Sequence, residues 1–110
     1  MDITISAITP QHKATSIVQA QLESMQELGR GNVVSVTILK TTPSLHNSPA
    51  NLIIRFTSGD TLIVKNTFDA GSRTPGSSEI YDLLKGLGVH HNDAARVFNF
   101  VDDRLVFDVQ

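Results

Sequence analysis

Apolar and polar residues alternate along this chain with two different periods, and each period predicts one kind of element. Runs with a period of two predict half-buried strands, whereas apolar residues at i, i+3, i+4 and i+7 predict amphipathic helices. Strand patterns occur at 3–5, 33–40, 51–57, 61–66, 97–101 and 104–109. Helical patterns occur at 10–28 and 80–87. The expected order of elements is therefore βαβββαββ.

The first helical segment is expected to begin at Thr9-Pro10 and to end near Leu28. Thr9 can accept a hydrogen bond from the first turn, and Pro10 suits the first helical position because its missing N–H would have no partner there. Gly29 then favours termination of the helix. The apolar face of this helix is expected to hold Ala14, Ile17, Val18, Leu22, Met25 and Leu28.

Residues 51–66 form the clearest hairpin pattern in the chain. We expect a turn at 58–60 with Gly59 in the left-handed conformation, because glycine adopts positive φ without strain. The expected cross-strand pairs are Thr57–Thr61, Phe56–Leu62 and Ile54–Val64. One face of the hairpin then holds Leu52, Ile54, Phe56, Leu62 and Val64, and the other holds Ile53, Arg55, Ile63 and Lys65. In the preceding strand we expect Val34, Val36 and Ile38 to share one side.

The C-terminal segment 97–109 is expected to form a second hairpin around Asp102-Asp103. Its apolar face would carry Phe98, Phe100, Leu105 and Phe107, and its other face Val97, Asn99, Val101, Val106 and Asp108. A different pattern stays open for 92–101. There Asn92 would cap a helix that runs through Ala94, Ala95 and Phe98.

These elements predict an α+β fold with one domain over residues 1–110. Apolar residues make up 40% of the chain and charged residues 18%, which is enough apolar material for one core. Each hairpin presents one apolar face, and two amphipathic helices can cover those faces. We therefore expect a two-layer sandwich with a mainly antiparallel sheet and two amphipathic helices.

Composition excludes several classes of function. The chain has no cysteine, which removes disulfides, thiolate metal sites, iron–sulfur clusters and cysteine nucleophiles, and favours a cytoplasmic location. Its net charge of −2 disfavours nucleic-acid binding, and Arg55 and Lys65 lack aromatic stacking partners beside them. Neither a signal peptide nor an apolar run of the ~20 residues that span a membrane is expected.

Two histidines and an aspartate lie close together after the second helix, as His90, His91 and Asp93. Imidazole and carboxylate groups are good metal ligands, and His46 could add another. However, adjacent residues of an extended chain point to opposite sides, and no regular ligand spacing is present. The pattern therefore favours a solvated connector over a metal-dependent protein, and we expect no metal or other cofactor.

The loop 71–79 is a candidate anion site of a small ligand-binding or enzymatic domain. Backbone N–H groups at a helix start, together with Arg73, Ser77 and Ser78, could hold a phosphate or carboxylate. The glycine-lysine signature of nucleotide loops is missing. Helix capping by Thr74-Pro75 or Ser77 explains the same residues, and this alternative is favoured.

No positioned nucleophile is present, because the chain lacks a GxSxG elbow. Asp102 and Asp103 form a carboxylate pair, but a hairpin tip exposes it to water, which removes the desolvation that tunes a general acid. The sequence therefore gives little support for an enzyme.

A surplus of apolar β-surface carries the leading hypothesis. If helices cover one side of the sheet, branched side chains remain on the other, and a contiguous exposed apolar patch usually marks a partner site. We expect a protein–protein interaction module, acting as a regulator, inhibitor or assembly component, that forms a homodimer through a sheet face or an edge strand. The candidate contact residues are Ile53, Arg55, Ile63, Lys65, Val97, Val101 and Val106, with Val33 and Leu39 alongside.

Overall fold

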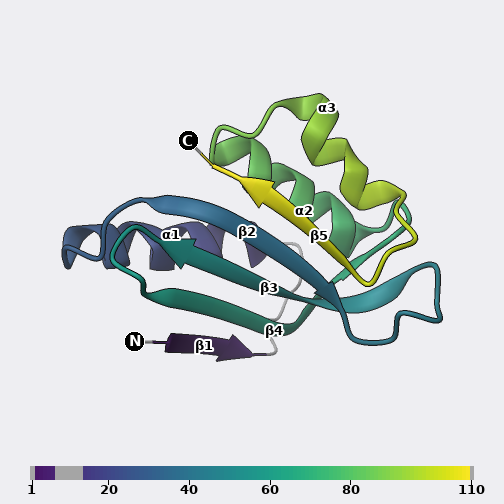
Figure 1. Cartoon of the computed structure of the whole chain (residues 1–110), viewed down its shortest axis with the longest axis horizontal. Helices are drawn as coiled ribbons and strands as arrows, with labels where there is room; N and C mark the ends of the chain where they lie inside the picture. The colour runs from purple at the N-terminus through teal and green to yellow at the C-terminus, as the bar shows by residue number, and fades with distance from the viewer. Residues whose placement is uncertain (1, 7–13, 110) are drawn as a thin grey trace.

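The computed structural model describes residues 2–6 and 14–109, which are built around a five-stranded sheet (Figure 1). The strands lie in the order β1-β4-β3-β2-β5, so β1 and β5 form the edges. β1 pairs in parallel with β4, and every other pair of neighbouring strands is antiparallel. The strand bounds are β1 Asp2–Ser6, β2 Val33–Lys40, β3 Ser48–Phe56, β4 Thr61–Ala70 and β5 Arg104–Asp108.

The helices form the second layer. Figure 1 shows α1 and α2 behind the sheet, with α3 beyond α2, near the edge formed by β5. Their bounds are α1 Ala14–Glu27, α2 Pro75–Gly86, α3 His91–Ala94 and the 3-10 helix η2 Ala95–Phe98. The predicted two-layer α+β sandwich with a mainly antiparallel sheet is confirmed. No helix in the described ranges is long and apolar enough to span a membrane.

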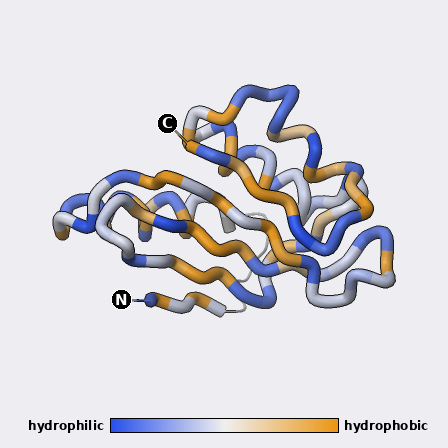
Figure 2. Tube along the Cα trace, viewed as in Figure 1, coloured by the Kyte–Doolittle hydropathy of each residue, from blue (hydrophilic) through white to orange (hydrophobic). Residues whose placement is uncertain are grey.

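A single apolar core lies between the two layers. In Figure 2 apolar residues recur along the central strands, while the segment around α3 is largely hydrophilic. The alternation of buried and exposed positions along each strand sends every second side chain into this core. The largest fully buried side chains are Val18, Met25, Val36, Ile38, Leu52, Ile54, Leu62, Val64, Ile80, Leu83, Leu84 and Val97.

The β3–β4 hairpin keeps the predicted faces but not the predicted pairs. Leu62 lies opposite Ile54 rather than Phe56, a shift of two residues. The cause is Gly59, whose φ of 88° and whose N–H bond to the Phe56 carbonyl place it last in a three-residue loop. The Phe56 N–H then donates to Asp60 and closes that loop. Because side chains alternate with a period of two, a two-residue shift leaves both faces unchanged.

A bulge at the start of β2 reverses one predicted assignment. The register of β2 against β3 shifts between Val33 and Ser35. Val33 is consequently buried in the core with Val36, and Val34 is exposed. The expectation that Val34 shares the side of Val36 is therefore wrong, and Val33 does not lie on the helix-free side of the sheet.

The strand predicted at 97–101 is replaced by helical structure, so the described part of the chain has one strand fewer than expected. α3 and η2 occupy this region, and the cap is the His90 side chain, which accepts a hydrogen bond from the Asn92 N–H. Val97 is fully buried, and its carbonyl accepts a hydrogen bond from Gly71. Val101 is 78% exposed in the loop before β5. Ala94 and Val97, three residues apart, point into the core, which is a helical spacing.

The two long helices follow their patterns to different extents. α2 begins as predicted, with Thr74 as N-cap, Pro75 in the first turn and a capping box between Thr74 and Ser77. On α1 the buried face is narrower than expected, because Ile17 is exposed and the helix ends at Glu27, which leaves Leu28 exposed in the turn that follows. Among the side chains of α1 that the structure describes, Val18, Leu22 and Met25 are buried, and the predicted face residue Ala14 lies outside that description. The predicted Thr9-Pro10 start lies outside the described residues.

Candidate functional site on the open face of the sheet

The side of the sheet opposite α1 and α2, here called the open face, carries a row of three branched apolar residues and two threonines across the five strands. Register fixes this row, because Thr4 lies opposite Ile63, Ile63 opposite Ile53, Ile53 opposite Thr37, and Thr37 opposite Val106. We call Thr4, Ile63, Ile53, Thr37 and Val106 the central row. Ile53 and Ile63 are half-buried by their neighbours in the sheet, and Val106 is 48% exposed.

Two rows of different charge flank the central row. The Arg104 row comprises the pair Ser6–Lys65 and the paired residues Asn51, Leu39 and Arg104, which lie on either side of a register shift between β3 and β4. Its two charged members are both basic. The Asp108 row comprises Asp2, Thr61, Arg55, Ser35 and Asp108, with two acidic groups and one basic group. The open face therefore has an apolar centre, a basic margin and a margin of net negative charge.

Five residues of the predicted contact set meet on this face, and two do not. Ile53, Arg55, Ile63, Lys65 and Val106 lie in the three rows, and Leu39 joins them as expected. Val97 is in the core and Val101 in a loop, because the strand that was expected to carry them is absent. Their assignment to this face is therefore wrong.

Sequence reasoning missed Arg104 and Thr37 as members of this face. Both residues could have been placed on this face from the strand period of two, because Arg104 lies two residues before Val106, and Thr37 two residues before Leu39. Their pairing partners could not be read from the sequence, because β2 and β5 are far apart along the chain.

The candidate anion loop 71–79 uses its polar groups to begin α2. The Ser77 hydroxyl is buried and donates to the Ser72 carbonyl at 2.7 Å, while the Ser77 N–H donates to Thr74 Oγ1 at 3.1 Å. The Ser78 N–H donates to the Thr74 carbonyl. The Arg73 guanidinium lies 4.1 Å from the centre of the Phe98 ring. These contacts support the capping interpretation of the loop.

His90 and His91 stack on one another with ring centres 4.2 Å apart, and both are exposed. Because the Nδ1 atom of His90 accepts the Asn92 N–H, this ring caps α3. Within residues 2–6 and 14–109 no group of three or more His, Asp or Glu side chains is arranged to hold a metal. The histidine pair therefore has a structural explanation as a connector.

Lys40 is a buried polar residue that sequence reasoning missed. Its side chain is 3% exposed, and the Nζ atom donates to the carbonyls of Phe100 at 2.7 Å and His46 at 3.0 Å. The ammonium also lies 4.4 Å from the centre of the Phe100 ring. Lys40 therefore ties the loop after β2 to the loop before β5. The sequence did indicate this burial, because Lys40 lies two residues after Ile38 and four after Val36, so its side chain points to the same inner face.

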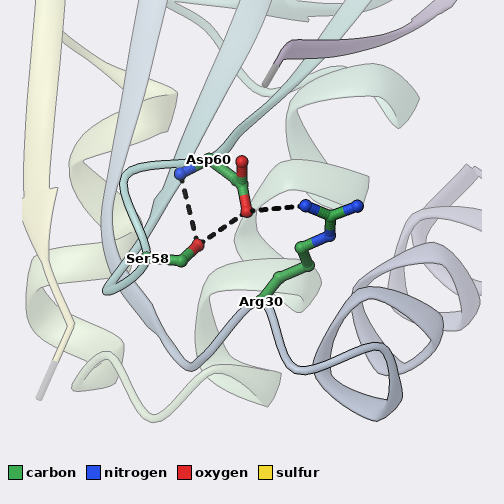
Figure 3. A network of polar contacts seen from close by, with 3 residues as sticks. All are labelled: Arg30, Ser58 and Asp60. Carbon is green, nitrogen blue, oxygen red and sulfur yellow. Dashed lines mark hydrogen bonds and ion pairs between the residues drawn. The ribbon is translucent and has the colours of Figure 1, made fainter.

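A second polar cluster joins the α1–β2 loop to the tip of the β3–β4 hairpin (Figure 3). Asp60 Oδ2 accepts from the Ser58 hydroxyl at 2.8 Å and lies 3.4 Å from the Arg30 guanidinium. The amino terminus of the chain, the hydrogen bond from Ser58 and the charge of Arg30 lower the pKa of the Asp60 carboxyl. The cluster therefore ties the α1–β2 loop to the turn between β3 and β4.

A shallow groove lies between α1 and the end of α2, on the helical layer. Its volume is about 310 Å³, and Gln19, Leu22, Glu23, Gln26, Gly86 and Leu87 line it. The groove holds a single carboxylate and no histidine or lysine, so it offers no set of groups for acid–base chemistry.

Comparisons of this chain with protein-family models, with curated proteins and with solved structures gave no match.

Proposed function

We propose that this chain is a protein-interaction module that binds a protein surface through the open face of its sheet. The observation that carries the proposal is the central row, in which Ile63, Ile53 and Val106 lie on a face that α1 and α2 leave free. Apolar side chains on a face that α1 and α2 do not cover gain free energy when a partner excludes water from them.

The chemistry of this face favours protein over other ligands. A single-stranded nucleic acid needs aromatic platforms and a basic groove, whereas the three rows contain no aromatic residue and include two carboxylates, Asp2 and Asp108. An apolar centre with polar and charged margins is the usual anatomy of a protein–protein interface. We infer a role as a regulator, inhibitor or assembly component, and the cytoplasmic location predicted from the cysteine-free composition belongs to the same proposal.

Capture with matched variants tests this function. Tagged wild-type chain, the double variant Ile53→Asp/Ile63→Asp and the control Leu28→Asp are each crosslinked in extract of the source cells and analysed by mass spectrometry. Leu28 is 70% exposed at the end of the helical layer, so it supplies the same chemical change away from the open face. Circular dichroism confirms that each variant is folded.

The proposal expects the same crosslinked protein, whether a second copy or another chain, with the wild type and the Leu28→Asp control. The Ile53→Asp/Ile63→Asp variant should capture at most about a tenth as much of this protein. The reason is that two charges in an apolar contact cost well over 1.4 kcal/mol of binding free energy. Equal capture by all three proteins would show that the open face is not the binding surface.

A further inference from the structure

We infer that the partner on the open face is a second copy of this chain, bound face to face about a two-fold axis that runs across the strands. This inference rests on the proposed function and adds the identity and orientation of the partner. It derives from the arrangement of charge around the central row, which is complementary to itself in one orientation.

The two margins of the open face carry net charges of opposite sign. Lys65 and Arg104 are the charged members of the Arg104 row, and both are basic. The Asp108 row carries Asp2 and Asp108 against one basic residue, Arg55. A second copy can place opposite charges against both margins only if its Asp108 row lies over the Arg104 row of the first.

Symmetry decides which orientation achieves this. A two-fold axis parallel to the strands keeps each row on the same side, so that basic margin would meet basic margin. An axis that lies between the sheets and runs across the strands reverses the strand direction of the second copy. The two margins then exchange places, and each Arg104 row faces an Asp108 row. Closed two-fold pairing of this kind is the commonest form of homo-oligomer.

β5 shows this self-complementarity within a single strand. Arg104 and Asp108 are four residues apart with Val106 midway, and Arg104, Val106 and Asp108 are all exposed. At about 3.4 Å per residue the two charged positions are roughly 14 Å apart, too far to pair within one chain. When two copies of β5 meet in opposite directions with Val106 over Val106, Arg104 of each copy faces Asp108 of the other.

The central row is compatible with the same axis. The axis passes along this row, so Ile53, Ile63 and Val106 each face their own counterpart in the second copy. The branched side chains then fill one layer between two sheets, which is how the two sheets of a β-sandwich pack. On the far side of the face, Lys65 comes near the partner's Asp2, which is exposed and pairs with the buried Thr61.

Charge reversal tests this geometry. The single variants Arg104→Asp and Asp108→Arg each place like charges at both symmetric contacts. Sedimentation velocity of the purified chain at low salt should then show each variant self-associating about tenfold or more weakly than the wild type. An equimolar mixture of the two variants should recover wild-type affinity, because each chain then meets a partner of the opposite charge at both contacts. The control Asp82→Arg makes the same charge change on α2 and should associate as the wild type does.

The outcomes separate this inference from the proposed function. A mixture that associates no better than its components would overturn the two-fold arrangement. A wild-type chain that stays monomeric at hundreds of micromolar would overturn self-association, even if crosslinked capture still depends on Ile53 and Ile63 and so leaves the proposed function standing. If the wild type stays monomeric and capture does not depend on Ile53 and Ile63, both proposals are contradicted. Recovery in the mixture, with the Asp82→Arg control unchanged, would establish the pair between Arg104 and the partner's Asp108.

Discussion

Ile53 lies directly opposite Ile63 on adjacent strands, on the face of the sheet that lies away from the helical layer. Each is half-buried, because threonines flank the pair within the row and supply part of the cover. The same two strands turn Ile54 and Leu62 inward, where both are fully buried. The sheet is therefore apolar at its centre on both faces, and within residues 2–6 and 14–109 the helical layer covers the inner face alone.

The buried ammonium of Lys40 predicts a stability difference. Replacing Lys40 by Met keeps the aliphatic stem but leaves the carbonyls of His46 and Phe100 without their donor. We expect a loss of about 2 kcal/mol in the free energy of unfolding, measured by urea denaturation. Lys85→Met is the control, since Lys85 is exposed on α2, and it should change stability by less than about 0.5 kcal/mol. Equal effects of the two changes would contradict the role assigned to Lys40.

The cluster around Asp60 predicts a pH dependence. Because the folded state lowers the pKa of this carboxyl, its contribution to stability is complete above the unfolded pKa of about 3.9. That contribution is lost as the pH falls through the lower folded pKa. Asp60→Asn should therefore destabilise the chain at pH 7, and the difference from the wild type should shrink as the pH falls below about 4. Urea denaturation over a pH series measures the difference in unfolding free energy between the two proteins. A difference that stays constant with pH would contradict a stabilising role for the ionised Asp60 carboxylate.

Gly71 lies where the chain leaves β4, and its backbone has no room for a side chain. Its φ is 116°, and a Cβ built there would lie 1.8 Å from the His46 carbonyl oxygen. Gly71→Ala should therefore cost more than about 2 kcal/mol of unfolding free energy. Gly29→Ala is the matched control, because Gly29 also has positive φ but nothing within 4 Å, and it should cost about 1 kcal/mol. Thermal unfolding of both variants checks the prediction, which is wrong if they melt together.

The predictions that held depend on periods of two within single strands. The faces of the β3–β4 hairpin were predicted correctly even though its pairs were displaced by two residues, because a displacement of two preserves parity. The loop itself is displaced because Gly59, which has positive φ, takes the last position of a three-residue loop and not the middle one. The bulge beside Val33 had no local signal, and one inserted residue was enough to exchange the environments of Val33 and Val34.

The segment 92–101 shows where pattern reasoning failed. Phe98 and Phe100 suggested a strand by their alternation, whereas Ala94 and Val97 have helical spacing, and both patterns fit the same residues. Packing of α3 and η2 beside α2 decided between them, and that contact cannot be read from local sequence. The candidate site was consequently predicted correctly for residues of β3 and β4 and for Val106, but wrongly for Val97 and Val101.

Val97 and Val101 offer a direct comparison of the two patterns. Val97→Ala removes two methyl groups from a fully buried site and should cost about 2 kcal/mol of unfolding free energy. Val101→Ala alters an exposed loop residue and should stay within about 0.5 kcal/mol of the wild type. Chemical denaturation distinguishes the two, and similar losses at both positions would instead favour the strand.

The most direct test of an interface on the open face is the mass of the purified chain by light scattering at tens to hundreds of micromolar, compared with that of Ile53→Asp. The wild type should approach twice the chain mass of 12.0 kDa, and Ile53→Asp should give the single-chain mass with an unchanged circular dichroism spectrum. The Leu28→Asp control should match the wild type. A monomeric wild type, or an Ile53→Asp variant that dimerises as strongly as the wild type, would contradict an interface between copies at this face.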